Sequence, residues 1–231
     1  MEKVEEVLKK LKKLSNPKNL EGMARFGINP NKALGISIPK LRKLAKEIGN
    51  NHKLALQLWK TGIHEARILA GLIDEVDKVT TKQMDLWIKD FDSWDVCDLV
   101  CANLFDKTSF AFKKAVGWTK RKREFEKRAG FALMACLAWH DKEADNNKFI
   151  KFFPAIKKES IDERNYVKKA VNWALRQIGK RNKELNKEAI KVALVIQKIE
   201  SRSARWIAND ALRELKSEAV QKRLSVIRPT K

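Results

Sequence analysis

The chain has 231 residues, 44% of them hydrophobic, and is long enough to bury a substantial core without disulfides or metal ions. Nine glycines, five prolines and one tyrosine are too few for a many-stranded sandwich or barrel, so the composition favours helices. Fifty Lys and Arg residues against 29 Asp and Glu residues give a formal net charge of +21, which predicts a polyanionic partner and favours nucleic acid.

The sequence also limits where the protein acts. No apolar run approaches the roughly 18 residues of a membrane-spanning helix, so we expect no membrane partner. The first segment, MEKVEEVLKKLKKLSNP, has apolar residues at helical spacing and lacks the apolar core of a signal peptide, which predicts a cytoplasmic protein. With three histidines, three cysteines and no CxxC spacing, we expect buried thiols, no metal and no cofactor. We also expect a monomer.

Helical periodicity of apolar residues recurs along almost the whole chain. In chain order, the predicted helices are Val4–Leu14, Pro39–Ile48, Leu54–Trp59, Glu65–Val76, Lys82–Asp90, Trp94–Phe105, Ala111–Trp118, Phe125–Trp139, Lys148–Ile156, Tyr166–Ile178, Lys187–Ile199, Ala204–Leu215 and Val220–Val226. Cap and turn residues such as Thr80, Ser93 and Ser201 fall between these runs. The one long irregular stretch, Gly27–Ile38, is expected to be a loop.

Several of these segments resemble one another. EARILAGLIDEV, EKRAGFALMACLAW, VKKAVNWALRQIGK and SARWIANDALREL each carry a charged residue near the start and continue as a helical stripe. Paired helices repeating at about forty residues are typical of HEAT-like arrays. We therefore expect one all-α domain over residues 1–231, a curved solenoid of HEAT-like antiparallel helix pairs (an α-α superhelix) whose concave face can follow a duplex.

Basic residues concentrate in the second half of the chain. Residues 112–130 hold eight cations against Glu124 and Glu126, namely Lys113, Lys114, Lys120, Arg121, Lys122, Arg123, Lys127 and Arg128. Further cations follow at Lys168, Lys169, Arg176, Lys180, Arg181, Arg202, Arg205 and Arg213. Such residues often form only a solvated face, but the large net charge favours phosphate contacts.

The common catalytic motifs for nucleotides, acyl transfer and zinc are absent from the sequence. What remains is SWDVCDLV, where Trp94 and Asp98 are one helical turn apart, and AVNWALR, where Trp173 and Arg176 are similarly related. An indole beside a carboxylate would stabilise a developing cation. From spacing alone, a buried tryptophan and an aspartate that interacts with the helix end is the stronger interpretation.

Five blocks change that balance: NPxxxxxMARFGI, LGISIPKLRKLAKEI, SWDVCDLV, EKRAGFAL and VKKAVNWALRQIGK. In order and spacing they resemble the AlkD-like family of alkylpurine DNA glycosylases, which are built from HEAT-like repeats. Two positions depart from the family pattern, Ser37 where relatives carry glutamine and Phe26 where they carry tyrosine. These departures bear on the substrate range.

The resemblance implies an enzyme that removes positively charged N3- and N7-alkylated purines from double-stranded DNA without flipping the base. It makes Asp98 the catalytic carboxylate and places Trp94 and Trp173 against the deoxyribose of the lesion. It also turns Arg128 and Arg176 toward the DNA backbone. We add Lys120, Arg121, Lys168, Lys169 and Arg205 as further DNA-binding residues because of their positive charge.

Two other classes of function remain open. A non-catalytic scaffold for DNA or RNA would use the same cations, with Asp98 only capping a helix or pairing with an arginine. A protein adaptor would instead present an exposed apolar groove, as many HEAT-like arrays do. The large basic excess argues against the adaptor.

Overall fold

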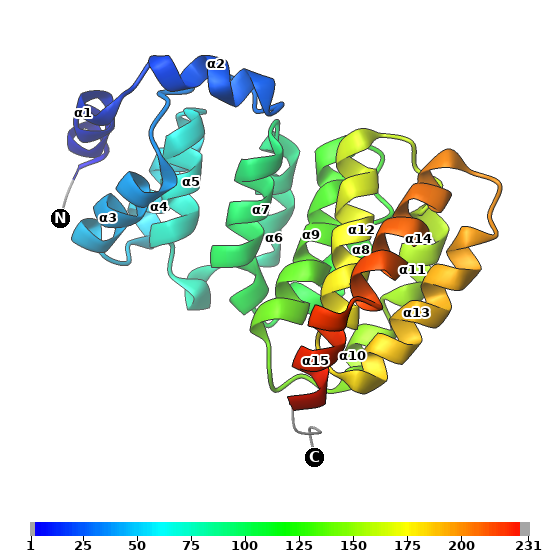
Figure 1. Ribbon diagram of the computed structural model, residues 1–231. Helices are drawn as coiled ribbons and strands as arrows, with labels where there is room; N and C mark the ends of the chain where they lie inside the picture. The colour runs from blue at the N-terminus through cyan, green and yellow to red at the C-terminus, as the bar shows by residue number, and fades with distance from the viewer. Residues whose placement is uncertain (1–2, 227–231) are drawn as a thin grey trace. The chain divides into compact units, whose positions relative to one another are not determined.

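The structure is a computed structural model that describes residues 3–226. Within these residues the chain forms fifteen α-helices, three short 3₁₀ helices and no strand, which confirms the predicted all-helical class (Figure 1). The chain divides into two compact units, Met1–Thr108 and Ser109–Lys231, and each is described by itself. Because helical repeats contact mainly their neighbours, compact sub-units are expected in such arrays, and the single domain stays a prediction.

The first unit contains seven α-helices among its described residues. They are α1 (Val4–Leu14), α2 (Lys18–Arg25), α3 (Ile38–Ile48), α4 (His52–Lys60), α5 (His64–Ile73), α6 (Thr81–Trp87) and α7 (Trp94–Asn103). The three 3₁₀ helices of the structure also lie here, at Val76–Lys78, Ile88–Asp90 and Phe105–Lys107.

Helix α5 is the centre of the first unit. It packs against α4, to which the short segment 61–63 connects it, and on its other sides against α3 and α7. Eight of its ten residues are buried, as its apolar composition requires. Between α4 and α6 the indoles of Trp59 and Trp87 stack with 3.9 Å between ring centroids. Helix α7 is thus held in the first unit by its packing on α5.

The second unit contains eight α-helices among its described residues. They are α8 (Ala111–Trp118), α9 (Glu124–His140), α10 (Asn146–Ile150), α11 (Phe153–Glu159), α12 (Asn165–Gly179), α13 (Lys183–Gln197), α14 (Arg202–Leu215) and α15 (Glu218–Val226). Sequential neighbours pack as pairs, α8 with α9 and α13 with α14. The second helices of successive pairs also lie side by side, α9 against α12 and α12 against α14 (Figure 1).

Close helix approach in the second unit depends on a glycine. A Cβ at Gly130 of α9 would lie 2.8 Å from the backbone nitrogen of Thr119 and 2.9 Å from the carbonyl oxygen of Ala115. Both distances are too short for a real methyl group. Only glycine therefore lets α9 lie this close to α8.

Most predicted helices are confirmed, with ends shifted by a few residues. The loop over Gly27–Ile38 is confirmed too, and the buried carboxylate of Glu65 holds it by accepting hydrogen bonds from the backbone nitrogens of Leu34 (2.8 Å) and Ile36 (3.1 Å). Three predictions are wrong. Helix α2 was not expected, the run over Lys148–Ile156 is split into α10 and α11, and the run over Lys82–Asp90 ends as a 3₁₀ helix.

Among the described residues, no helix is both long enough and apolar enough to span a membrane.

Candidate active site and nucleic-acid interface

Helix α7 carries the predicted catalytic pair of the first unit. The helix begins at Trp94, directly after the N-cap residue Ser93, and Asp98 follows Trp94 by about one turn. Both side chains are half-buried. The two residues therefore lie in the first half of one helix and keep part of their surface accessible, while their catalytic role stays a prediction.

The start of α7 is fastened to the segment that follows α2. The backbone nitrogen of Asn29 donates to Ser93 Oγ (2.8 Å), and the amide side chain of Asn29 donates to Asp92 (3.0 Å). The indole nitrogen of Trp94 donates to the carbonyl oxygen of Phe26 (3.0 Å), whose own side chain is exposed. These bonds fix the position of the Trp94 indole relative to the backbone.

A second carboxylate on α7 is committed to a partner inside the protein. Asp95 Oδ2 lies 2.8 Å from Nε2 of the buried His64 of α5. Burial alone would lower the pKa of His64, but the hydrogen bond and the negative charge of Asp95 outweigh it and raise the pKa above 6.5. The pair joins α5 to α7 and commits the Asp95 carboxylate to a contact inside the protein.

In the second unit, Trp173 and Arg176 lie on α12. Trp173 is half-buried. The guanidinium of Arg176 bonds to the carboxylate of Glu214 and lies 3.6 Å from that of Asp210, both on α14. Lys180 donates to the same Glu214 at 2.5 Å. Arg176 therefore joins α12 to α14 in the structure, and its predicted contact with DNA stays untested.

Arg128 of α9 is buried, with 6% of its surface exposed. Its guanidinium donates to the carbonyl oxygen of Tyr166 (2.7 Å), and the Tyr166 backbone nitrogen donates to Glu124 (3.1 Å). These bonds fasten α9 to the first turn of α12. Of the predicted DNA contacts, Arg128 is the one with the least accessible side chain, so its contact with a phosphate also stays a prediction.

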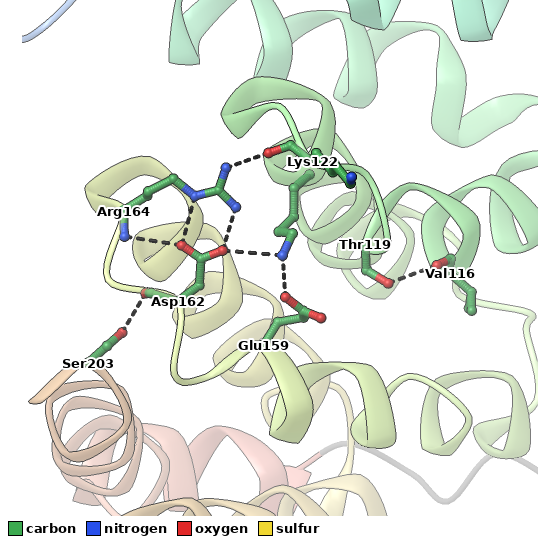
Figure 2. Close-up of polar contacts among 8 residues, drawn as sticks. Val116, Thr119, Lys122, Glu159, Asp162, Arg164 and Ser203 are labelled. Atoms are coloured by element: carbon green, nitrogen blue, oxygen red, sulfur yellow. Dashed lines mark hydrogen bonds and ion pairs between the residues drawn. The ribbon is translucent and has the colours of Figure 1, made fainter. Parts of the chain in front are cut away.

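The loop between α8 and α9 carries Lys120 and Arg121, of which Lys120 is exposed and Arg121 half-exposed. Arg164 holds this loop by donating to the carbonyl oxygen of Lys122 (2.7 Å) and, at 2.9 and 2.5 Å, to the carboxylate of Asp162 (Figure 2). The basic loop is therefore anchored to the segment before α12.

Two cations, Arg164 and Lys127, compensate the charge of Asp162 in this anchor. Burial would raise the pKa of Asp162, but hydrogen bonds from Arg164 and Lys127 outweigh it and lower the pKa below the ordinary carboxyl value. Lys127 also bonds to Glu159. The hydroxyl of Ser203 donates to the Asp162 carbonyl oxygen (2.9 Å), which ties the same corner to α14 (Figure 2).

The remaining predicted DNA contacts lie at the first turns of α12 and α14. Lys169 and Arg205 are exposed. Lys168 is half-exposed, and its ammonium lies 5.4 Å from the ring centroid of Trp206, an indole with 41% of its surface exposed.

Sequence reasoning missed three features: the His64–Asp95 pair, the Asp162–Arg164 anchor and the exposed Trp206. The His64–Asp95 pair joins residues on different helices, and nothing in the local sequence marks Asp162 and Arg164 as an anchor or Trp206 as exposed. A signal did exist in the second unit, where the Asn172–Asp210 and Arg176–Glu214 contacts both span 38 residues, as does the contact of Lys168 with Trp206.

Over residues 3–226, no group of three or more His, Cys, Asp and Glu side chains is arranged to hold a metal ion. The three cysteines are buried thiols, as predicted.

Comparison with known proteins identifies the family. The family described as "DNA alkylation repair enzyme" matches residues 7–215. No curated protein matches the chain at a significant level. A solved structure described as "A new family of proteins related to the HEAT-like repeat DNA glycosylases with affinity for branched DNA structures" is similar over 96% of both chains, with a TM-score of 0.78 and 19% identity.

A second solved structure, "Designed armadillo repeat protein YIII(Dq.V1)4CPAF in complex with peptide (KR)4", covers 80% of this chain and 88% of its own, with a TM-score of 0.34 and 14% identity. That likeness is too weak to support a conclusion. The first shows that the fold is that of the HEAT-like repeat proteins. Since the family match spans most of the sequence, the chain belongs to the DNA alkylation repair enzyme family.

Proposed function

We propose that the protein is a DNA glycosylase that hydrolyses the N-glycosidic bond of positively charged N3- and N7-alkylated purines in duplex DNA, without flipping the base. The observation that carries this proposal is the first half of α7, where the half-exposed Asp98 lies one turn after Trp94 and the N-terminal end of the helix is fixed by Ser93 and Asn29. Family membership and the net charge of +21 support the same activity.

The chemistry suits these residues. An alkylated purine already bears a positive charge, so it leaves without protonation by a general acid. As the glycosidic bond lengthens, positive charge moves to the sugar, and a fixed carboxylate such as Asp98 stabilises it or orients the attacking water. An indole face adds a cation–π contact to the same sugar. We assign the carboxylate role to Asp98 and aromatic contacts to Trp94 and Trp173.

The proposal does not assign this role to Asp95, the neighbouring carboxylate on α7. Asp95 is 12% exposed and paired with His64, so its charge is already compensated inside the protein. Removal of one preorganised electrostatic stabiliser typically lowers the rate about 10²- to 10³-fold. The proposal assigns an effect of that size to Asp98.

A second function is favoured by one observation. The similar solved structure is described as having affinity for branched DNA structures. On that precedent, the protein binds DNA through its cations without excising bases. The two functions share a ligand and differ in whether a base is released.

The test is release of free base from duplex DNA that contains N7-methylguanine or N3-methyladenine. We expect Asp98→Asn to release base about 10²-fold more slowly than the wild type while binding the duplex equally well. The matched control is Asp77→Asn, which removes an exposed carboxylate from a 3₁₀ helix of the same unit and should leave the rate unchanged. Equal rates for Asp98→Asn and the wild type would contradict the assignment.

A further inference from the structure

Helices α12 and α14 lie side by side, and contacts between them repeat at successive turns. Asn172 donates to Asp210 (2.7 Å), and one turn later Arg176 bonds to Glu214. One turn earlier, at the same 38-residue separation, Lys168 faces Trp206 instead of a carboxylate. Toward the N-terminal ends of the two helices, the partner on α14 thus changes from a carboxylate to an aromatic ring.

The cations around Trp206 are not neutralised. No ion pair involves Lys168, Lys169, Arg202 or Arg205 anywhere in the described residues. By contrast, cations further along the same two helices, Arg176, Lys180 and Arg213, all bond to carboxylates. Two acidic residues lie close in the chain. Glu163 accepts hydrogen bonds from Ser201 and from the backbone nitrogen of Ser203 at the start of α14, and the exposed Glu200 directly precedes Ser201 but forms no ion pair with Arg202.

Positive charge at these N-terminal ends destabilises α12 and α14 themselves. The first turns of α12 and α14 contain no acidic residue, although carboxylates there would interact favourably with the helix dipole. Arg202 and Arg205 add positive charge to the positive end of α14. A cluster of four uncompensated cations at two helix N-termini is therefore suited to an anionic ligand.

Trp206 adds a feature that phosphate binding does not require. Its indole is 41% exposed and follows Arg205 directly on the exposed side of α14. Any nucleobase has a flat face that can stack on an indole, but in an intact duplex those faces are already stacked on one another. Aromatic rings interleaved with cations are the combination that binds single-stranded nucleic acid.

We infer that Trp206, with Lys168, Lys169, Arg202 and Arg205, forms a binding site for an unpaired nucleobase and its flanking phosphates in single-stranded DNA. The base stacks on the exposed part of the indole. Lys168, whose ammonium lies against the ring in the structure, and the neighbouring cations then contact the phosphates on either side of that base. This site needs only that DNA is the ligand, and it is independent of base excision.

The test measures binding of the full chain to unmodified DNA, as a labelled oligothymidylate and as a fully paired duplex. We expect Trp206→Ala to weaken oligothymidylate binding about 5- to 100-fold, the loss typical of one stacked base, and to change duplex binding by less than about threefold. Trp206→Phe should retain most of the affinity because it keeps an aromatic face.

The matched control is Trp139→Ala, which removes the other exposed tryptophan of this unit, 56% exposed at the end of α9. It should bind both DNAs like the wild type. Unchanged oligothymidylate binding by Trp206→Ala would overturn the inference. An equal loss for single strand and duplex would overturn it as well, because the ring would then only support the cations. Since no base is released in this assay, its outcome is separate from that of the glycosylase test.

Discussion

Asp92, Asp95 and Asp98 follow one another at intervals of three residues, and the structure gives each a different environment. Asp92 accepts a hydrogen bond from Asn29 before α7 begins, Asp95 is paired with the buried His64, and Asp98 is half-exposed one turn from Trp94. One residue type thus serves three purposes within two helical turns.

The His64–Asp95 pair should make stability depend on pH near neutrality. Because the folded protein raises the pKa of His64 above 6.5, the ion pair stabilises the fold fully below pH 6.5 and its contribution is lost as pH rises through the folded-state pKa. We expect His64→Gln to lower the free energy of unfolding by about 1–3 kcal/mol at about pH 6 and by less at about pH 8.

Chemical unfolding of wild type and variant at both pH values measures this difference. His140→Gln, which changes an exposed histidine at the end of α9, is the control and should show no such pH dependence. A His64→Gln penalty that is equal at both pH values would contradict the predicted ion pair.

For single residues, the sequence predicted part of the candidate site. The predicted one-turn spacing of Trp94 and Asp98 on a single helix is confirmed in α7, because spacing on one helix is a local property. The environments of Arg128 and Arg176 were not predictable in the same way. Their partners, Tyr166 and Glu214, are each 38 residues away and belong to other helices.

Among the elements, helices with a buried stripe were predicted well and the others poorly. Helix α2 has no buried residue, so it lacks the apolar face on which the prediction depends. The break between α10 and α11 follows from Pro154, which occupies the first turn of α11, where its missing N–H is tolerated. Apolar periodicity continues across that break and hides it.

The close packing of α8 and α9 gives a test at the scale of elements. Gly130→Ala should destabilise the protein by about 1–3 kcal/mol, because the new methyl group would overlap backbone atoms of Thr119 and Ala115 and force the helices apart. Urea unfolding of the variant measures the loss.

Gly117→Ala is a matched control on α8, since a methyl group there meets nothing within 4 Å. It should leave stability unchanged or raise it by up to about 1 kcal/mol, because alanine favours helix. If the two substitutions had the same effect, close approach would not be the reason for glycine at position 130.

For the whole molecule, the net charge of +21 predicts how DNA binding responds to salt. Each phosphate contacted on B-form duplex releases counterions and contributes about −0.9 to the slope of log affinity against log salt concentration. We expect a steep slope that Asp98→Asn shares with the wild type, because this substitution removes no cation. Titration of a labelled duplex at several salt concentrations measures it, and a shallow slope would contradict a phosphate-binding surface.

Composition and repeats predicted the fold class because they reflect the whole chain, and the HEAT-like fold of the similar solved structure agrees with them. Activity is a property of a few atoms, and family membership alone does not fix it. Base release is therefore the decisive property to measure for this protein.

The measurement that tests the central proposal most directly is base release by wild-type protein in excess over duplex DNA that contains one N7-methylguanine. The glycosylase account predicts free N7-methylguanine and an equal amount of abasic site, and no release from the same duplex with unmodified guanine, whose uncharged base is a poor leaving group. A duplex that is fully bound and releases no base would contradict the account and leave DNA binding as the function.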